Sequence, residues 1–228
     1  MNDTFLLALA MIPALVIAIV CHEVAHGWAA LMLGDPTAKE RRRLTLNPIR
    51  HVDPVGTLLV PGGLALAGMP VFGWAKPVPV DYRRLRDPRT GMMLVAAAGP
   101  LTNLVLAALG AVVLGLTARF ASGPLDGALG YFVVTAQLFI LINIFLALFN
   151  LLPIPPFDGS HILEGLLPRR AAMVYDRLRP LGFPLVFVLL VAVPYLFPGS
   201  GIVENVVAPP VDWLEGNYMR LAAFVAGA

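Results

Sequence analysis

The sequence predicts an all-α integral membrane protein with roughly four to six membrane-associated segments. Of its 228 residues, 58% are hydrophobic and only 13% are charged, whereas a soluble domain carries about 25% charged residues. Several apolar runs approach the roughly 20 residues that a helix needs to cross a bilayer. Lysine and arginine are almost confined to short stretches between these runs. Together these observations predict membrane helices joined by short polar connections.

The first half of the chain begins with one long predicted helix. It runs over about residues 4–33 and ends at Gly34 and Pro36, a usual helix stop. It lacks a basic leading region and continues past any cleavage site, so we expect a retained helix rather than a signal peptide. Residues 55–71 are apolar but broken by prolines and glycines. Residues 73–80 alternate in polarity and contain prolines, which is typical of a short edge strand or hairpin.

The second half contains the most regular predicted spans, residues 92–116 and 131–152. Residues 181–197 form a shorter apolar stretch with two internal prolines. The tail from residue 206 onward is either an interfacial helix or a weak final span.

The basic residues predict the orientation of these segments. Of the 16 lysines and arginines, 14 lie within residues 39–50, 76–89 and 169–179. The positive-inside rule places all three stretches in the cytoplasm and the N-terminus outside. Because two of them flank residues 55–71, that segment must enter and return on the cytoplasmic side. Broken helix at membrane depth is tolerated where it is buried in protein or lines a wet cavity, so we expect a re-entrant or broken element.

A motif late in the first predicted helix carries the chemistry. His22, Glu23 and His26 form an H-E-x-x-H pattern, whose histidines share one helix face and can bind one zinc ion. Glu23 lies beside them, where a general base belongs. Ionisable groups inside a membrane helix cost about 2.5–3.5 kcal/mol each on insertion scales and usually serve function. The alternative is that both histidines hydrogen-bond to neighbouring helices and Glu23 is a protonated packing residue.

A catalytic zinc site usually has three protein ligands and one open position, so a third ligand must come from elsewhere. Asp158 is the best candidate, because it follows a proline-rich segment that cannot form a regular helix and precedes Gly159, which permits an unusual turn. The predicted orientation places it at the depth of the histidine pair. The alternative is an aspartate that caps a helix, in which case His51 competes as a ligand. His161 is either a partner of the site or a loop histidine.

These motifs resemble those of the site-2 proteases, a family of intramembrane zinc metalloproteases. The resemblance rests on H-E-x-x-H in the first span and on residues 150–159 at the end of a later one, and it covers about residues 13–165. Residues 45–48, 73–80 and 98–103 are similar as well. The chain shows no PDZ-like or nucleotide-sensing domain and so resembles the compact members.

The resemblance implies one protease domain over residues 1–228, with a catalytic core of about residues 4–165 and a C-terminal membrane segment and tail over residues 166–228. It implies that the two histidines and Asp158 bind one zinc ion per chain and that Glu23 activates water. Asn150 would steady the substrate or the developing oxyanion.

The implied reaction is hydrolysis of a peptide bond in or near the transmembrane segment of a membrane-protein substrate, as in regulated intramembrane proteolysis. The bacterial cytoplasmic membrane is the expected location, with the site toward the cytoplasm. The rival interpretations are a zinc-binding membrane transporter and a catalytically silent relative.

The predicted strand over residues 73–80 suggests how a substrate is held. A substrate helix hides its carbonyls in internal hydrogen bonds, so the peptide must be extended before water attacks. An exposed edge could hold it by strand addition, with Trp74 and Lys76 as candidate contacts, and the alternative is a proline-rich connector. The basic stretches lack interleaved aromatics and flank spans, so we assign them to topology and lipid headgroups and expect no nucleic-acid partner.

Overall fold

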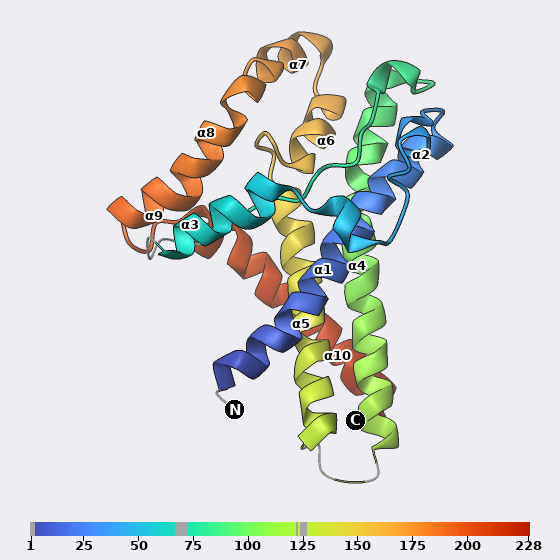
Figure 1. Cartoon of the computed structure of the whole chain (residues 1–228), viewed down its shortest axis with the longest axis vertical. Helices are drawn as coiled ribbons and strands as arrows, with labels where there is room; N and C mark the ends of the chain where they lie inside the picture. The colour runs from blue at the N-terminus through green and yellow to red at the C-terminus, as the bar shows by residue number, and fades with distance from the viewer. Residues whose placement is uncertain (1–2, 67–72, 122, 124–126) are drawn as a thin grey trace.

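The chain folds into an array of helices around three long ones, as the computed structural model shows for residues 3–66, 73–121, 123 and 127–228 (Figure 1). The long helices are α1 (Asp3–Met32), α4 (Pro88–Phe120) and α5 (Gly127–Asn150). The shorter helices of the first half are α2 (Thr37–Glu40), η1 (Pro48–His51), η2 (Pro54–Leu59), α3 (Val60–Leu66) and η3 (Tyr82–Arg84). Those of the second half are α6 (Asp158–Leu166), α7 (Arg169–Asp176), η4 (Arg179–Leu181), α8 (Gly182–Phe187), η5 (Val188–Ala192), α9 (Val193–Leu196), η6 (Val203–Val207) and α10 (Ala208–Ala226).

The three long helices confirm the three main predicted spans. Their ends lie within four residues of the expected ones, and all three are long and apolar enough to cross a membrane. A fourth such helix covers Arg169–Leu196 and so starts well before the predicted residues 181–197. The apolar helix Pro54–Leu64 is shorter than these four, and part of the predicted segment 55–71 lies outside the described residues.

Small residues let α4 pack closely against α5. Ala107, Ala111, Ile140 and Ile144 are fully buried in the main core cluster. A Cβ atom at Gly110 would lie 3.0 Å from the side chain of Ile140. Close backbone approach through small residues is the usual way in which helices associate in membranes. Helices α1, α4 and α5 all contact one another.

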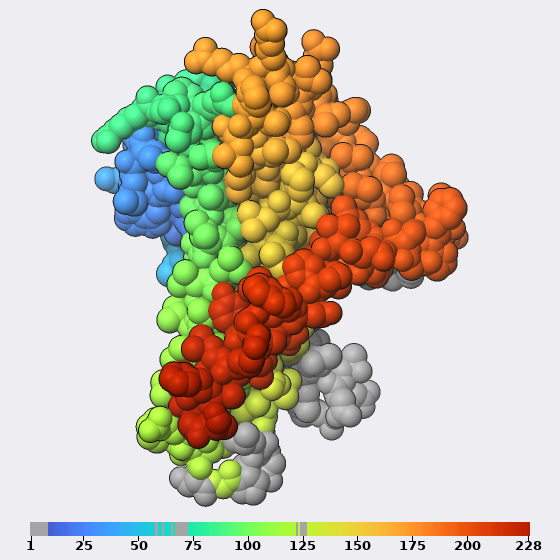
Figure 2. All heavy atoms as spheres, turned by 180° about the vertical axis from the view of Figure 1, so that it is seen from behind, coloured from blue at the N-terminus to red at the C-terminus, as the bar shows by residue number. Residues whose placement is uncertain are grey.

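The tail that the sequence left open is a packed helix. Seen from behind, α10 crosses α4 and α5 obliquely (Figure 2). Its residues Val211 and Ala222 belong to the main core cluster. The Tyr218 hydroxyl donates a hydrogen bond to the Leu104 carbonyl of α4, at 3.0 Å. The tail therefore braces the helices from which the site is built.

The hairpin expected over residues 73–80 is an extended connector, and the residues described by the structure form no β-strand. Its backbone is nevertheless fixed on one side. The N–H of Trp74 donates to the Gly56 carbonyl at 3.1 Å, and the N–H of Lys76 donates to the His51 carbonyl at 2.8 Å. Arg43 donates to the Lys76 carbonyl at 2.8 Å. The prolines explain the missing strand, because Pro77 and Pro79 have no N–H to donate.

Candidate metal centre

The two histidines of the H-E-x-x-H motif lie one turn apart on the face of α1 that packs against α4. His22 and His26 are only 5% and 9% exposed, and their ring centroids are 4.6 Å apart. Four-residue spacing on a helix places both side chains on one face, so their Nε2 atoms can approach a common point.

Asp158 joins the histidines from the other half of the chain. It is the first residue of α6, and its Oδ2 lies 3.1 Å from Nε2 of His22 and 3.4 Å from Nε2 of His26. The turn that delivers it depends on Gly159, because a Cβ there would lie 2.2 Å from the Leu151 carbonyl oxygen. One ligand atom from each of the three residues lies within 4.8 Å of the others.

The hydrogen bonds at Nδ1 of the two imidazole rings determine whether each Nε2 atom carries a hydrogen or a lone pair. Nδ1 of His22 lies 2.6 Å from Oδ1 of Asn103, and Nδ1 of His26 lies 2.7 Å from the carbonyl oxygen of Val95. Both oxygens only accept hydrogen bonds, so each Nδ1 carries the hydrogen. In the neutral rings, each Nε2 therefore turns a lone pair toward Asp158.

Three electron-pair donors thus face one another in a buried space. Asp158 Oδ2 is buried and has no hydrogen-bond partner within the described part of the chain. Such an arrangement is repulsive unless a proton or a metal cation lies between the atoms. Around a tetrahedral zinc with bonds of about 2.0–2.1 Å, neighbouring ligand atoms are about 3.3–3.4 Å apart, close to the two distances from Asp158. The donor set fits zinc.

Space beside the histidines is provided by a glycine of α4. A Cβ at Gly99 would lie 2.5 Å from both Cε1 and Nε2 of His26 and 2.6 Å from Cε1 of His22. Such distances are far inside van der Waals contact. A side chain at position 99 would therefore occupy the space where the ligand atoms converge.

Glu23 is held by the extended connector. Its Oε2 accepts a hydrogen bond from the backbone N–H of Val78 at 2.8 Å. Val78 itself is buried. Glu23 therefore has a fixed orientation beside the histidines, and the connector over residues 73–80 passes directly over the motif.

The other predicted residues have different surroundings. Asn150 ends α5 and donates one amide N–H to the Leu146 carbonyl at 2.9 Å. His51 is buried and its Nε2 lies 2.9 Å from the Thr45 carbonyl oxygen, outside the three-residue cluster. The ring of Trp74 packs against Phe183, with centroids 5.2 Å apart. Lys76 is exposed. Of the predicted site, the structure thus brings together the two histidines, Glu23 and Asp158.

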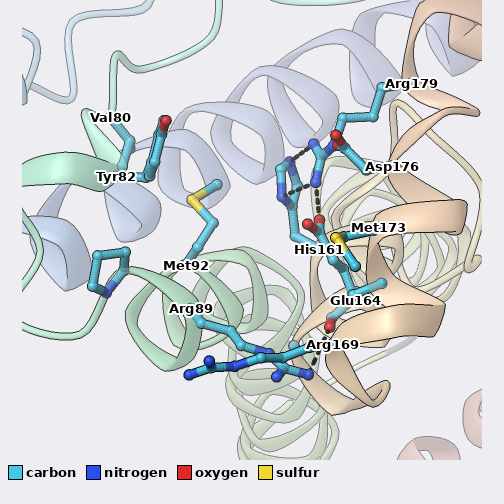
Figure 3. Close-up of a pocket in the computed structure, with 13 residues that line it drawn as sticks. Val80, Tyr82, Arg89, Met92, His161, Glu164, Arg169, Met173, Asp176 and Arg179 are labelled. Atoms are coloured by element: carbon cyan, nitrogen blue, oxygen red, sulfur yellow. Dashed lines mark hydrogen bonds and ion pairs between the residues drawn. The ribbon is translucent and has the colours of Figure 1, made fainter.

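A cavity of about 760 Å³ opens one helical turn beyond Asp158 (Figure 3). Val80, the last residue of the connector, and Tyr82 line one side, and His161 and Glu164 of α6 line another. Arg179 of η4 contacts both His161 and Glu164 of α6. Burial, followed by the charge of Arg179, lowers the pKa of His161 below its ordinary value. His161 therefore faces this cavity as a neutral ring.

Sequence reasoning missed the residues that surround the histidines. Gly99 and Asn103 lie in the stretch 98–103 that was noted without a role, and the Val78 N–H and Val95 carbonyl are backbone groups. Asn103 gave one signal that could have been used. An amide in the middle of an apolar span is costly to bury without partners.

Comparison with known proteins adds independent information. The model of peptidase family M50 matches residues 125–193, which include Asp158 but not the H-E-x-x-H motif. YwhC of Bacillus subtilis, named as a zinc metalloprotease, is 41% identical over 194 residues, which cover 82% of this chain and 83% of that protein. Rip2 of Mycolicibacterium smegmatis, named likewise, is 34% identical over 179 residues, covering 75% and 62% of the two chains. No solved structure matches the chain.

Proposed function

Because the chain belongs to peptidase family M50, the site-2 proteases, we propose that His22, His26 and Asp158 bind the zinc ion of this intramembrane zinc metalloprotease. The observation that carries the assignment is the convergence of two Nε2 lone pairs and the orphaned Asp158 Oδ2 in one buried space. Since both Nδ1 atoms are engaged by fixed acceptors, the site is prepared for a cation before one arrives.

The mechanism assigns one role to each remaining group. Zinc bound by the three ligands supplies Lewis-acid activation of water and of the scissile carbonyl. Glu23 takes a proton from the attacking water and passes it to the leaving amine. The Val78 N–H orients the Glu23 carboxylate for this exchange. Asn150, at the end of α5, assists as an amide donor toward the developing oxyanion.

The substrate is a membrane protein cut in or near its transmembrane segment, in the manner of regulated intramembrane proteolysis. The three basic stretches support an orientation with the site toward the cytoplasm and the N-terminus outside. We place the protein in the bacterial cytoplasmic membrane because it resembles the compact members of the family.

The connector over residues 73–80 is the proposed edge that holds an extended substrate. Its alternate residues Trp74, Lys76 and Val78 make the hydrogen bonds to the protein body described above. The backbone groups of Ala75 and Pro77 point the opposite way, because successive residues of an extended chain alternate in direction. This side therefore offers the Ala75 N–H and the carbonyls of Ala75 and Pro77, since Pro77 has no N–H. A substrate strand paired there would pass Glu23 and reach the cavity lined by Val80 and Tyr82.

This proposal separates the two predicted contacts. Trp74 is packed against Phe183 and so shapes the edge, whereas exposed Lys76 is free to meet substrate. We expect Lys76→Ala to raise KM severalfold with zinc content unchanged, measured on a single-span substrate in liposomes. If neither Lys76→Ala nor Trp74→Ala alters cleavage while zinc content stays constant, the edge is a connector only.

The assignment of Glu23 is tested with purified protein, a single-span substrate and quantified zinc. Glu23→Gln keeps an acceptor for the Val78 N–H but cannot take a proton. Loss of a general base typically costs about 10²–10⁴-fold in rate, so we expect at least a 10²-fold loss with full zinc content.

The matched control for Glu23→Gln is Glu40→Gln, which removes a surface carboxylate paired with Arg84, and it should cleave normally. Full activity of Glu23→Gln would exclude it as the base. Zinc bound by wild type without cleavage of any tested substrate would favour the transporter or the silent relative.

A further inference from the structure

Two asparagines lie fully buried inside apolar spans. Asn103 of α4 and Asn143 of α5 are both 0% exposed. A buried amide without hydrogen-bond partners is unfavourable in a membrane interior, where no water can replace the missing partners. These side chains must therefore have specific hydrogen-bond partners, and those partners indicate the function of the two asparagines.

The two amides form a chain of hydrogen bonds that ends on a proposed zinc ligand. Asn143 Nδ2 donates to the Phe139 carbonyl at 2.8 Å, and Asn143 Oδ1 accepts from Asn103 Nδ2 at 2.8 Å. Asn103 Nδ2 also donates to the Ala18 carbonyl at 3.2 Å, and its Oδ1 lies 2.6 Å from Nδ1 of His22. The chain thus links α5, α4 and α1.

The direction of this chain is fixed by backbone carbonyls. The carbonyls of Phe139 and Ala18 can only accept, so each amide must turn its NH₂ group toward them. Asn103 is then left with only its oxygen for His22. If Asn103 were reversed, the Ala18 carbonyl would face an oxygen and His22 Nδ1 would face an N–H. If Asn143 were reversed, the Phe139 carbonyl would face an oxygen and the NH₂ groups of the two amides would face each other.

We propose that Asn103, oriented by Asn143, is a positioning residue that keeps the hydrogen of His22 on Nδ1 and its Nε2 lone pair directed at the metal. The proposal rests on the assignment of His22 as a zinc ligand. Partners of this kind fix the ring orientation and tautomer of metal-binding histidines, and their loss typically costs about 10–100-fold in metal affinity.

The rival explanation is that the asparagines only join helices. In that case, the donated hydrogen bonds to Ala18 and between the amides would matter, and the contact to His22 would not. Two substitutions separate these functions. Asn103→Leu removes the acceptor and the donors, whereas Asn103→Asp keeps an acceptor for His22 Nδ1 but removes both donated bonds and places oxygens opposite Ala18 and Asn143.

The experiment measures zinc affinity by chelator competition, the absorption spectrum of bound Co²⁺, and thermal stability, on the full chain in detergent. We expect Asn103→Leu to lose 10–100-fold in zinc affinity and to show an altered Co²⁺ spectrum. Asn103→Asp should bind zinc more tightly than Asn103→Leu. Without metal, however, the Asn103→Asp protein should be less stable than the Asn103→Leu protein. Asn143→Leu should lose less, because Ala18 still orients Asn103.

The matched control is Tyr218→Phe, which removes another hydrogen bond to α4, at the neighbouring Leu104 carbonyl. It should lower stability without changing zinc affinity. Wild-type zinc affinity in Asn103→Leu, or weaker zinc binding in Asn103→Asp than in Asn103→Leu, would overturn the proposal. If Asn103→Leu does not fold, a wild-type Co²⁺ spectrum in Asn103→Asp would support positioning through the acceptor for His22 Nδ1, and an altered spectrum would overturn it.

His22→Ala tests the underlying assignment separately. Loss of zinc in His22→Ala with wild-type affinity in Asn103→Leu would reject only the positioning role. Unchanged zinc binding in His22→Ala would reject the proposed zinc site itself.

Discussion

At the scale of a single residue, the proposed metal site restricts which residue types fit at position 99. A Cβ at Gly99 would lie 2.5 Å from the His26 ring and 2.6 Å from the His22 ring. Alanine is otherwise preferred over glycine inside a helix by about 0.5–1 kcal/mol. Helix propensity and the requirements of the metal centre therefore act in opposite directions at this position.

We predict that Gly99→Ala lowers zinc affinity at least about tenfold, since loss of ligand alignment commonly costs 10–100-fold, and lowers proteolysis with it. Zinc content after dialysis and cleavage of a single-span substrate measure both effects. The control is Gly216→Ala in α10, where a Cβ meets nothing within 4 Å, and it should leave zinc unchanged. Tight zinc binding by Gly99→Ala would show that the histidines can move aside.

At the scale of elements, one buried carboxylate joins the end of α1 to the connector. Gly34 ends the helix with a φ of +110°, and Asp35 follows it with no exposed surface. Asp35 Oδ1 accepts from the Thr37 N–H at 2.9 Å, and its Oδ2 accepts from the Asp81 N–H at 2.7 Å. Burial opposes ionisation, but these hydrogen bonds outweigh it and lower the pKa of Asp35 below its ordinary 3.8. The connector that orients Glu23 is thereby anchored to α1.

We predict that Asp35→Asn destabilises the protein by about 1–3 kcal/mol, because its NH₂ group would face a buried N–H donor. A lowered folded-state pKa contributes stability above the ordinary value of 3.8, and this is lost as pH falls through the folded-state pKa. The difference in Tm between wild type and variant should therefore be full at pH 6 and shrink below about pH 4. A difference that stays constant down to pH 3 would contradict a role for the ionised carboxylate.

On the scale of the whole molecule, the fold separates a basic end from an apolar body. The helices α2, η3 and α7, in or next to the three basic stretches, lie toward one end of the long axis (Figure 1). The C-terminal end of α4 and the start of α5 lie at the opposite end. At 1.5 Å per residue, α4 is about 50 Å long, enough to cross a bilayer core of about 30 Å. Packing of α10 onto α4 and α5 supports our proposal that the chain acts as one protease domain.

We predict that the basic end faces the cytoplasm. Cys21 is the only cysteine, so single probes can be introduced as Arg41→Cys and Phe120→Cys in a Cys21→Ser background. A membrane-impermeant thiol reagent applied to intact cells should label Phe120→Cys, whereas Arg41→Cys should react only after the membrane is opened. The opposite pattern would reverse the orientation, and zinc retention in Cys21→Ser is the necessary control.

The membrane class, the three main spans and the H-E-x-x-H motif follow from the amino-acid sequence alone. Each of these depends on residues close together in the chain: apolar runs are continuous, and four-residue spacing sets a shared helix face. Asp158 could also be predicted, because a zinc site with two histidines lacks a ligand and few candidates lay at that depth.

The surroundings of these groups, in contrast, depend on how the chain folds in three dimensions. The partners of His22, His26 and Glu23 lie 81, 69 and 55 residues away, and two of the groups that they use are backbone atoms. A backbone N–H or carbonyl can be supplied by almost any residue type, so such partners cannot be recognised from the sequence. The helical state of the tail was likewise set by packing against α4 and α5, where long-range contacts outweigh local pattern. The connector is held extended by its hydrogen bonds to η1 and η2, and its prolines keep it from forming a strand.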